Sequence, residues 1–229
     1  MDKDIVYILR NKVDPDELRY SLRSVERNFP HRKVWFFGGC PKGIQPDEYV
    51  EVKQWGGTKW ARATNTIRVV CENDDVTKDF WLFNDDFFIL EAVRSLPYMI
   101  RGELQERVDT LKKRGNIHVY GDHLEAAMMQ LQEKGFGTFD YTLHVPMLIN
   151  RAKALEVLDT FPRCPMFRSL YGNYCNVGGI VTRDVKIRDN KGLPDKGQTL
   201  LSTSDGSFAD GEVGKYIRSR FTERSKWEK

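Results

Sequence analysis

Two short apolar runs separated by an amphipathic stretch constrain the fold of this chain more than any other sequence feature. The first run is DIVYIL at residues 4–9, and the second is KVWFFGG at residues 33–39. Both are rich in β-branched or aromatic residues, which is typical of buried strands. Residues 14–30, between them, carry apolar side chains at helical spacing, namely Leu18, Leu22, Val25 and Phe29. The pattern predicts an α/β fold with a mostly parallel sheet flanked by helices.

The rest of the chain also contains predicted strands and helices. Further strands are expected at 49–55 and 79–90. Helices are expected within 56–73, 103–114, 122–134, 141–161 (after Pro146) and 210–221. Residues 163–187 indicate loop and strand, and residues 191–208 indicate a loop rich in glycine, serine and lysine. We find no repeat and no linker, so a single domain over residues 1–229 is the simplest prediction.

Composition narrows the class of protein. Hydrophobic residues make up 40% of the 229, enough for one well-cored domain, and the net charge is only +3. No apolar run approaches the ~20 residues of a membrane span, and the N-terminus lacks a signal-peptide core. We therefore expect a cytoplasmic protein without a membrane partner. The four cysteines lack C-x-x-C spacing, so reduced thiols are favoured over a disulfide between Cys164 and Cys175.

The segment WLFNDDFFIL at 81–90 sets three polar residues, Asn84, Asp85 and Asp86, inside an apolar strand. Adjacent carboxylates in an apolar setting are costly unless a cation compensates them. At the carboxyl end of a strand they suit Mg²⁺ or Mn²⁺ bound together with a diphosphate. We predict Asp86 as the direct ligand, with Asp85 acting through water or contacting the sugar or ribose. The alternative is that Asn84 and Asp85 only shape a turn.

A hydrophobic strand that ends in D-D resembles the metal-binding element of GT-A-type glycosyltransferases. The resemblance implies a Rossmann-like single domain that binds Mn²⁺ or Mg²⁺ and a nucleotide-diphosphate sugar. Residues 1–90 would then hold nucleotide and metal. Residues 91–229 would hold the acceptor and supply a C-terminal lid and tail.

A second resemblance is to the Stealth family of sugar-1-phosphate transferases. DELRYSLRSVERNFPHRKVWFFGG at 16–39 is similar to its second conserved region, and FNDDFF at 83–88 occupies the place of its N-D-D element. LHVP at 143–146, together with Phe167 and Arg168, resembles its third region, which carries a functional histidine and arginine. The resemblance implies a catalytic role for His144 and Arg168, with His144 a metal ligand or general base.

Several further residues are candidates for binding or catalysis. Asp140 is the alternative general base or an orienting carboxylate for His144. Arginines can hold phosphates through bidentate hydrogen bonds, although an exposed helix face with paired charges is the alternative. The candidate nucleotide-binding residues are Arg10, Arg19, Arg23, Asn65, Asn84 and Asp85.

The C-terminal segments suggest a lid and a polymer contact. STSDGSF at 202–208 has the composition of a mobile lid or of a plain surface loop. KYIRSRFTERSKWEK at 215–229 interleaves basic residues with Tyr216, Phe221 and Trp227. This pattern suits a nucleic-acid backbone, and it equally suits an amphipathic last helix with solvated charges.

Three functions follow from these patterns. The leading one is a metal-dependent glycosyltransferase that moves a sugar from a nucleotide-diphosphate sugar to an acceptor hydroxyl. One possible acceptor is a hydroxymethylated pyrimidine in DNA, as in some phage enzymes, which would place the protein in the host cytoplasm. The second is a Stealth-like sugar-1-phosphate transferase acting on a polysaccharide. The third is a nucleotide- or glycan-binding module without catalysis.

Overall fold

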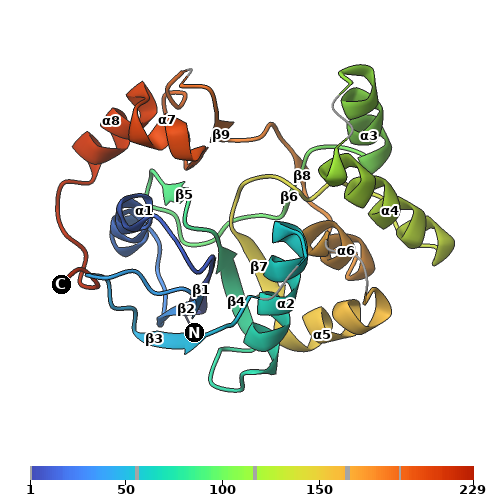
Figure 1. Cartoon of the computed structure of the whole chain (residues 1–229), viewed down its shortest axis with the longest axis horizontal. Coiled ribbons are helices and arrows are strands. Elements are labelled where there is room, and N and C mark those ends of the chain that lie inside the picture. The colour runs from blue at the N-terminus through green and yellow to red at the C-terminus, as the bar shows by residue number, and fades with distance from the viewer. Residues whose placement is uncertain (1, 55–56, 116–117, 163–165, 191) are drawn as a thin grey trace.

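A five-stranded mixed sheet forms the centre of the protein (Figure 1). The computed structural model describes residues 2–54, 57–115, 118–162, 166–190 and 192–229. The strand order is β3-β2-β1-β4-β7, where the strands span Glu48–Glu51, Val34–Gly38, Asp4–Leu9, Asp79–Phe83 and Met147–Asn150. The first four strands are parallel, and β7 runs antiparallel to β4. The α/β class is confirmed, whereas the main sheet is mixed because of β7.

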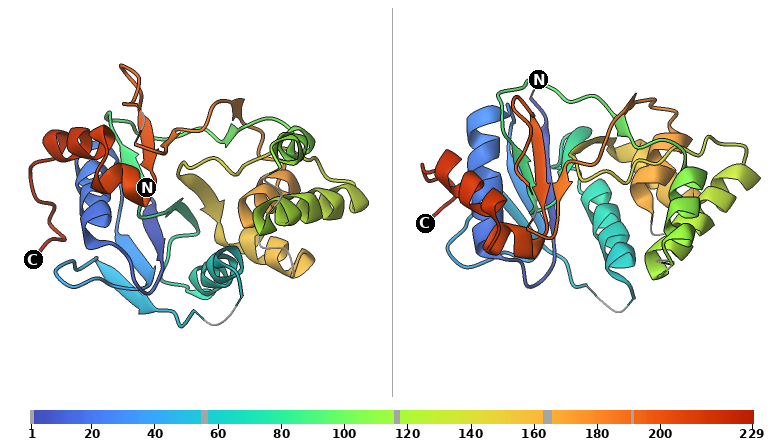
Figure 2. Two further views of the ribbon diagram at one scale, coloured as in Figure 1. Left: turned by 45° about the horizontal axis from the view of Figure 1, so that its top comes forward. Right: turned by 90° about the horizontal axis from the view of Figure 1, so that it is seen from above.

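Helices cover both faces of this sheet, as Figure 2 shows. Strand β1 alternates its side chains between the faces, as a pleated strand must. Tyr7 packs in one core with α1 (Pro15–Asn28), and Val6 packs in another with α2 (Lys59–Glu72). The predicted strand–helix–strand opening is therefore confirmed.

The second core continues into a layer of four more helices, α3 (Leu104–Lys113), α4 (Val119–Glu133), α5 (Arg151–Thr160) and α6 (Phe167–Tyr174). The helices expected at 103–114 and 122–134 are confirmed. Two expectations here are wrong. Strand β7, rather than a helix, directly follows Pro146, and residues 163–187 contain α6. Helix α6 depends on long-range packing, because Gly172 lies so close to the ring of Tyr141 that a Cβ would clash with it.

A second, three-stranded sheet stands apart from the main one, in the order β5-β10-β9. Its strands span Phe87–Ile89, Leu200–Thr203 and Lys186–Ile187. The apolar segment 79–90 is therefore two strands in different sheets, joined by a turn. The loop expected at 191–208 includes β10 and the start of α7 (Asp205–Ala209). Ser202 and Thr203 are fully buried, so the segment proposed as a lid is packed into the fold.

A third, two-stranded sheet joins β6 (Met99–Ile100) to β8 (Ile180–Val181). The first and second halves of the chain share the larger sheets, because β7 pairs with β4 and β10 pairs with β5. The halves expected at 1–90 and 91–229 are thus interleaved within one domain.

The C-terminal segment returns to the body of the protein after α8 (Glu212–Arg220). Phe221 and Trp227 are both 2% exposed, and the carbonyl of Trp227 accepts a hydrogen bond from the backbone N–H of Gln45 at 2.8 Å. Two of the three aromatic rings of the basic tail are therefore core residues and are not available to stack on nucleic-acid bases.

Three cysteines, Cys40, Cys71 and Cys175, are free thiols, and Cys164 lies outside the described residues. Within the described ranges, no helix is long and apolar enough to cross a bilayer.

Candidate functional site

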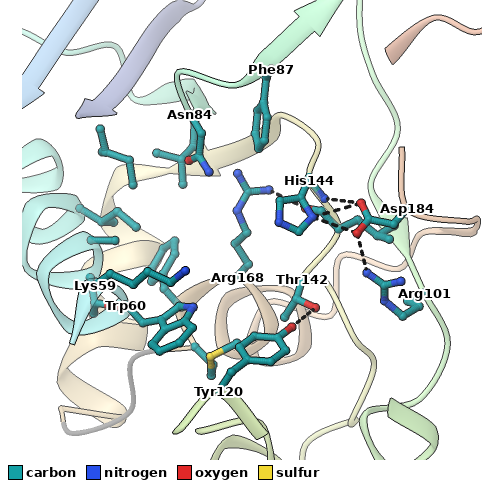
Figure 3. A pocket seen from close by; sticks show the side chains of 18 of the residues that line it. Lys59, Trp60, Asn84, Phe87, Arg101, Tyr120, Thr142, His144, Arg168 and Asp184 are labelled. Atoms are coloured by element: carbon teal, nitrogen blue, oxygen red, sulfur yellow. Dashed lines mark hydrogen bonds and ion pairs between the residues drawn. The ribbon is translucent and has the colours of Figure 1, made fainter. Parts of the chain in front are cut away.

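A pocket of about 510 Å³ opens at the carboxyl ends of β1 and β4. Ile8, Leu82 and Asn84 form its floor, and the first turns of α2 form one wall. The segment before β7 and the start of α6 form the other walls (Figure 3). In open α/β sheets this edge is where ligands bind, because loops and helix N-termini converge there. The position of the pocket makes it the candidate functional site.

The pocket carries an excess of positive charge. Three of its cationic side chains, Lys59, Arg107 and Arg168, have no carboxylate partner among the described residues. The Nε of Arg107 and the Nη2 of Arg168 are buried and lack a hydrogen-bond partner within the described structure. Asp184 is the one acidic side chain among the described lining residues. Unpaired buried donors with positive charge suit an anionic ligand.

Arg168 is the most constrained of these cations. It extends from α6 toward Asn84 and Phe87, and its guanidinium lies 5.4 Å from the centre of the Phe87 ring (Figure 3). Its Nη1 donates a hydrogen bond to the carbonyl of Val145. Burial lowers the pKa of Arg168 to about 10, and the charge of Asp86 opposes that shift. The side chain is therefore still charged at neutral pH, without an ion-pair partner, and an anion would relieve this cost.

His144 lies beside Arg168, between the two residues whose carbonyls Arg168 contacts, and it forms a pair with Asp184 (Figure 3). The imidazole Nδ1 is 2.9 Å from Oδ2 of Asp184, and the backbone N–H of His144 donates to Oδ1 at 3.1 Å. The carboxylate of Asp184 accepts a hydrogen bond from Nδ1–H, so Nε2 carries the lone pair of the ring and accepts a hydrogen bond from Nη2 of Arg188 at 3.5 Å. Burial raises the pKa of Asp184, but the hydrogen bonds from His144 and the charge of Arg101 outweigh it and leave that pKa well below normal.

Asp140 lies one layer behind this pair and does not line the pocket. Its carboxylate is fully buried, and Oδ1 accepts hydrogen bonds from the N–H and the hydroxyl of Thr142 at 2.8 and 2.6 Å. Arg101 bridges the two acids, with Nε 3.3 Å from Asp140 and Nη2 3.0 Å from Asp184. Asp140 thus orients Arg101, which corrects the expectation that it is itself a base at the site.

Five of the six predicted nucleotide-binding residues lie outside the pocket, namely Arg10, Arg19, Arg23, Asn65 and Asp85. Arg19 pairs with Asp16 at 2.7 Å, and Arg23 pairs with both oxygens of Glu228 at 2.7 Å each. Asn65 lies on the exposed face of α2. Arg10, at the end of β1, pairs with Asp205 at 3.1 Å, and its charge also acts on Asp85. Only Asn84 of the predicted nucleotide set lines the pocket.

The N-D-D turn brings together several acids beside the pocket. Asp86 accepts hydrogen bonds from Nζ of Lys186 at 2.6 Å and from the hydroxyl of Ser202 at 2.8 Å. Asp85 has no ion pair among the described residues, and burial, with the charge of Asp86, raises its pKa to about 6. Glu17 is buried beneath the turn and hydrogen-bonded to Thr203.

The predicted metal set, Asp85, Asp86 and His144, does not come together. Within the described residues no three His, Cys, Asp or Glu side chains are placed to hold a metal ion. His144 is paired with Asp184, and Asp86 is paired with Lys186. Of these three side chains, only that of Asp85 forms no ion pair with another described residue.

The buried carboxyl group of Glu17 is expected to make the stability of the folded protein depend on pH. Burial, with the charges of Asp86 and Asp85, raises its pKa to about 8 from an ordinary 4.5. The unfolded chain therefore releases this proton at a lower pH than the folded protein. The associated stability is present below pH 4.5 and is lost as the pH rises toward 8. We expect Glu17→Gln to remove this loss, which is up to about 1.4 kcal/mol per pH unit between pH 5 and 7.

Urea unfolding of both proteins at pH 5, 6 and 7 measures this effect. The difference in unfolding free energy between Glu17→Gln and wild type should grow with pH. Glu26→Gln, at an exposed position on the same helix, is the matched control and should give a constant difference. A constant difference for Glu17→Gln as well would show that this carboxyl group is ionised in the folded protein.

The residues that sequence reasoning missed are Lys59, Arg101, Arg107, Asp184, Lys186 and Arg188. Lys59 and Arg107 lie on helices whose other charges are solvated, so no spacing separates them from surface residues. Asp184 and Lys186 lie just after a glycine-rich turn, where periodicity carries no signal. The one local cue is the alternation of charged residues in TRDVKIRD at 182–189.

No protein-family model matches this chain, and no curated protein matches it. The proposal about its function therefore depends on the pocket and on the motif resemblances.

Proposed function

We propose that the protein is a transferase that takes a nucleotide-diphosphate sugar and moves the sugar to an acceptor hydroxyl. The observation that carries this proposal is the set of cations without carboxylate partners, Lys59, Arg107 and Arg168, in a pocket at the carboxyl ends of β1 and β4. A diphosphate matches them, because it brings several negative charges and oxygen pairs that a guanidinium binds bidentately. The motif resemblances point to the same class of donor.

The reaction assigns separate tasks to the cations of the pocket and to the His144–Asp184 pair. The acceptor oxygen forms a bond to the anomeric carbon, and the bond from that carbon to the diphosphate breaks. The electron pair leaves with the nucleotide diphosphate, whose charge Arg168 and the other free cations stabilise. The hydroxyl proton passes to Nε2 of His144, while Asp184 holds the ring in the required tautomer. Asp140 and Arg101 position Asp184.

The resemblance also implies Mn²⁺ or Mg²⁺, and the donor set does not fit that expectation. Two of the three predicted ligands already have ion-pair partners, and no three His, Cys, Asp or Glu side chains in the described part of the chain are placed to hold a metal ion. We derive no step through a metal.

Transfer of a sugar 1-phosphate is the second candidate, and one contact favours it. The guanidinium of Arg188 lies 3.5 Å from Nε2 of His144, so an acceptor oxygen activated there would sit beside a positive charge. A phosphoryl group under attack is stabilised by such a charge. The mass of the product separates the candidates, because phosphate is retained only in this second reaction.

A binding screen tests the proposal. The protein is incubated with a panel of nucleotide-diphosphate sugars, and the melting temperature is recorded with and without Mn²⁺. At least one donor should raise the melting temperature by about 5 °C at saturation, because a ligand that binds only the folded state stabilises it. Duplex DNA with hydroxymethylated pyrimidines and a polysaccharide then serve as acceptors. Absence of stabilisation by every donor would contradict the proposal.

A further inference from the structure

Two strands that are distant from Asp86 in the sequence converge on one of its carboxylate oxygens. Lys186 of β9 places Nζ 2.6 Å from Oδ2, and Ser202 of β10 places its hydroxyl 2.8 Å from the same atom. The lysine and aspartate side chains are only 15% and 10% exposed. This oxygen therefore has both a counter-ion and a neutral hydrogen-bond donor.

The register of the small sheet produces this contact. Ser202 pairs with Phe87 of β5 on one side and with Lys186 of β9 on the other. Asp86 directly precedes β5, so the pairing sets the three side chains beside one another. A surface lysine could reach many acids, but this lysine is held in place by two strand pairings.

The charges around the turn explain what the lysine does. Glu17, Asp85, Asp86 and Asp205 form an acidic group, and among the described residues the cations Arg10, Arg168 and Lys186 oppose it. A buried carboxylate without a counter-ion is strongly destabilising. A divalent cation on Oδ2 of Asp86 would meet the ammonium group at the same atom, and one on Oδ1 would still lie close to that positive charge, so the two cations oppose each other.

We infer that Lys186 is a built-in counter-ion that takes the place of a divalent metal at the N-D-D turn. The protein then binds its anionic ligand with its own cations and without Mn²⁺ or Mg²⁺. The inference rests on the proposed function only for the identity of that ligand. The exclusion of the metal depends only on the ion pair between Lys186 and Asp86.

Binding of Mn²⁺ alone tests the statement about the metal. The electron paramagnetic resonance signal of free Mn²⁺ is followed while the ion is titrated into wild type and Lys186→Met. Wild type should leave the signal unchanged. Lys186→Met removes the cation in direct contact with Asp86 and leaves Arg10 and Arg168 at a greater distance, so it should bind Mn²⁺ at least about tenfold more tightly. Binding by wild type that is lost in Asp86→Asn, or no gain in Lys186→Met, would overturn the inference.

Two further variants keep the test decisive if Lys186→Met folds poorly. The double variant Lys186→Met/Asp86→Asn removes both charges of the pair, so it should fold and should not bind Mn²⁺. Lys186→Arg keeps the counter-ion and should behave as wild type. Mn²⁺ binding by the double variant equal to that of Lys186→Met would place the metal elsewhere and overturn the inference.

Calorimetry with the nucleotide sugars separates this inference from the proposed function. If a donor binds, its affinity should be the same in EDTA and in Mn²⁺ for wild type, and higher in Mn²⁺ for Lys186→Met. A wild-type affinity that falls about tenfold or more in EDTA would overturn the inference, and it would still support the proposal that the protein binds a nucleotide-sugar donor. If no donor binds under any condition, the proposed function fails, and the Mn²⁺ titrations still decide the role of Lys186.

Discussion

Replacing Arg168 with glutamine is expected to weaken nucleotide-sugar binding about 100-fold and to leave the stability nearly unchanged. The guanidinium has a buried donor without a partner and no carboxylate to pair with, so an anionic ligand makes its missing contacts. Charge-assisted hydrogen bonds of this kind contribute about 1.5–3 kcal/mol. In the free protein, removing an unpaired charge from a largely buried position offsets the hydrogen bonds lost at the carbonyls of Leu143 and Val145.

Isothermal titration calorimetry and urea unfolding measure the two halves of this prediction. Arg27→Gln is the matched control, because Arg27 is exposed on α1, outside the pocket, and donates a hydrogen bond to the carbonyl of Arg220. The control should bind as wild type does. The unfolding free energy of Arg168→Gln should stay within about 1 kcal/mol of wild type. A variant that unfolds easily but keeps its affinity would show that Arg168 is a structural residue.

Replacing Arg23 with methionine is expected to give the opposite result, a loss of about 3–5 kcal/mol in stability with unchanged ligand affinity. Arg23 is 12% exposed and holds Glu228, which is 3% exposed, through two hydrogen bonds of 2.7 Å. Burial raises the pKa of Glu228, but the contacts with Arg23 and Ser225 outweigh it and lower that pKa. Removing the arginine leaves a buried carboxylate without its counter-ion, which is strongly destabilising.

Unfolding free energies of Arg23→Met, Glu228→Gln and the double variant measure the coupling of the pair. The double variant should recover part of the loss, because no uncompensated charge remains. Calorimetry of folded Arg23→Met should give the wild-type affinity. A weakened affinity with normal stability would return Arg23 to the nucleotide-binding role that the motif resemblance implies for it.

The order of the first elements was predictable because each depends on local sequence. Apart from Asp4 and Lys33 at their starts, the runs at 4–9 and 33–39 are apolar, as is typical of strands buried on both faces, and α1 has its cap at Asp14 and an apolar stripe. Helix α6 and strand β10 were not predictable in this way. Their side chains are buried against partners distant in sequence, such as Tyr141 for α6 and Phe88 for β10.

The same distinction between local sequence and tertiary packing applies to the candidate site. The sequence alone determined that Asn84, His144 and Arg168 carry chemistry worth testing, through a polar turn in an apolar strand and through motif resemblance. Only the tertiary structure decided which charges are paired. It joined Arg23 to Glu228, Asp86 to Lys186 and His144 to Asp184, and it left Arg168 without a carboxylate. The reason is physical: the effect of a charged side chain depends on its burial and its partner, and here those partners lie 40 to 205 residues away in the chain.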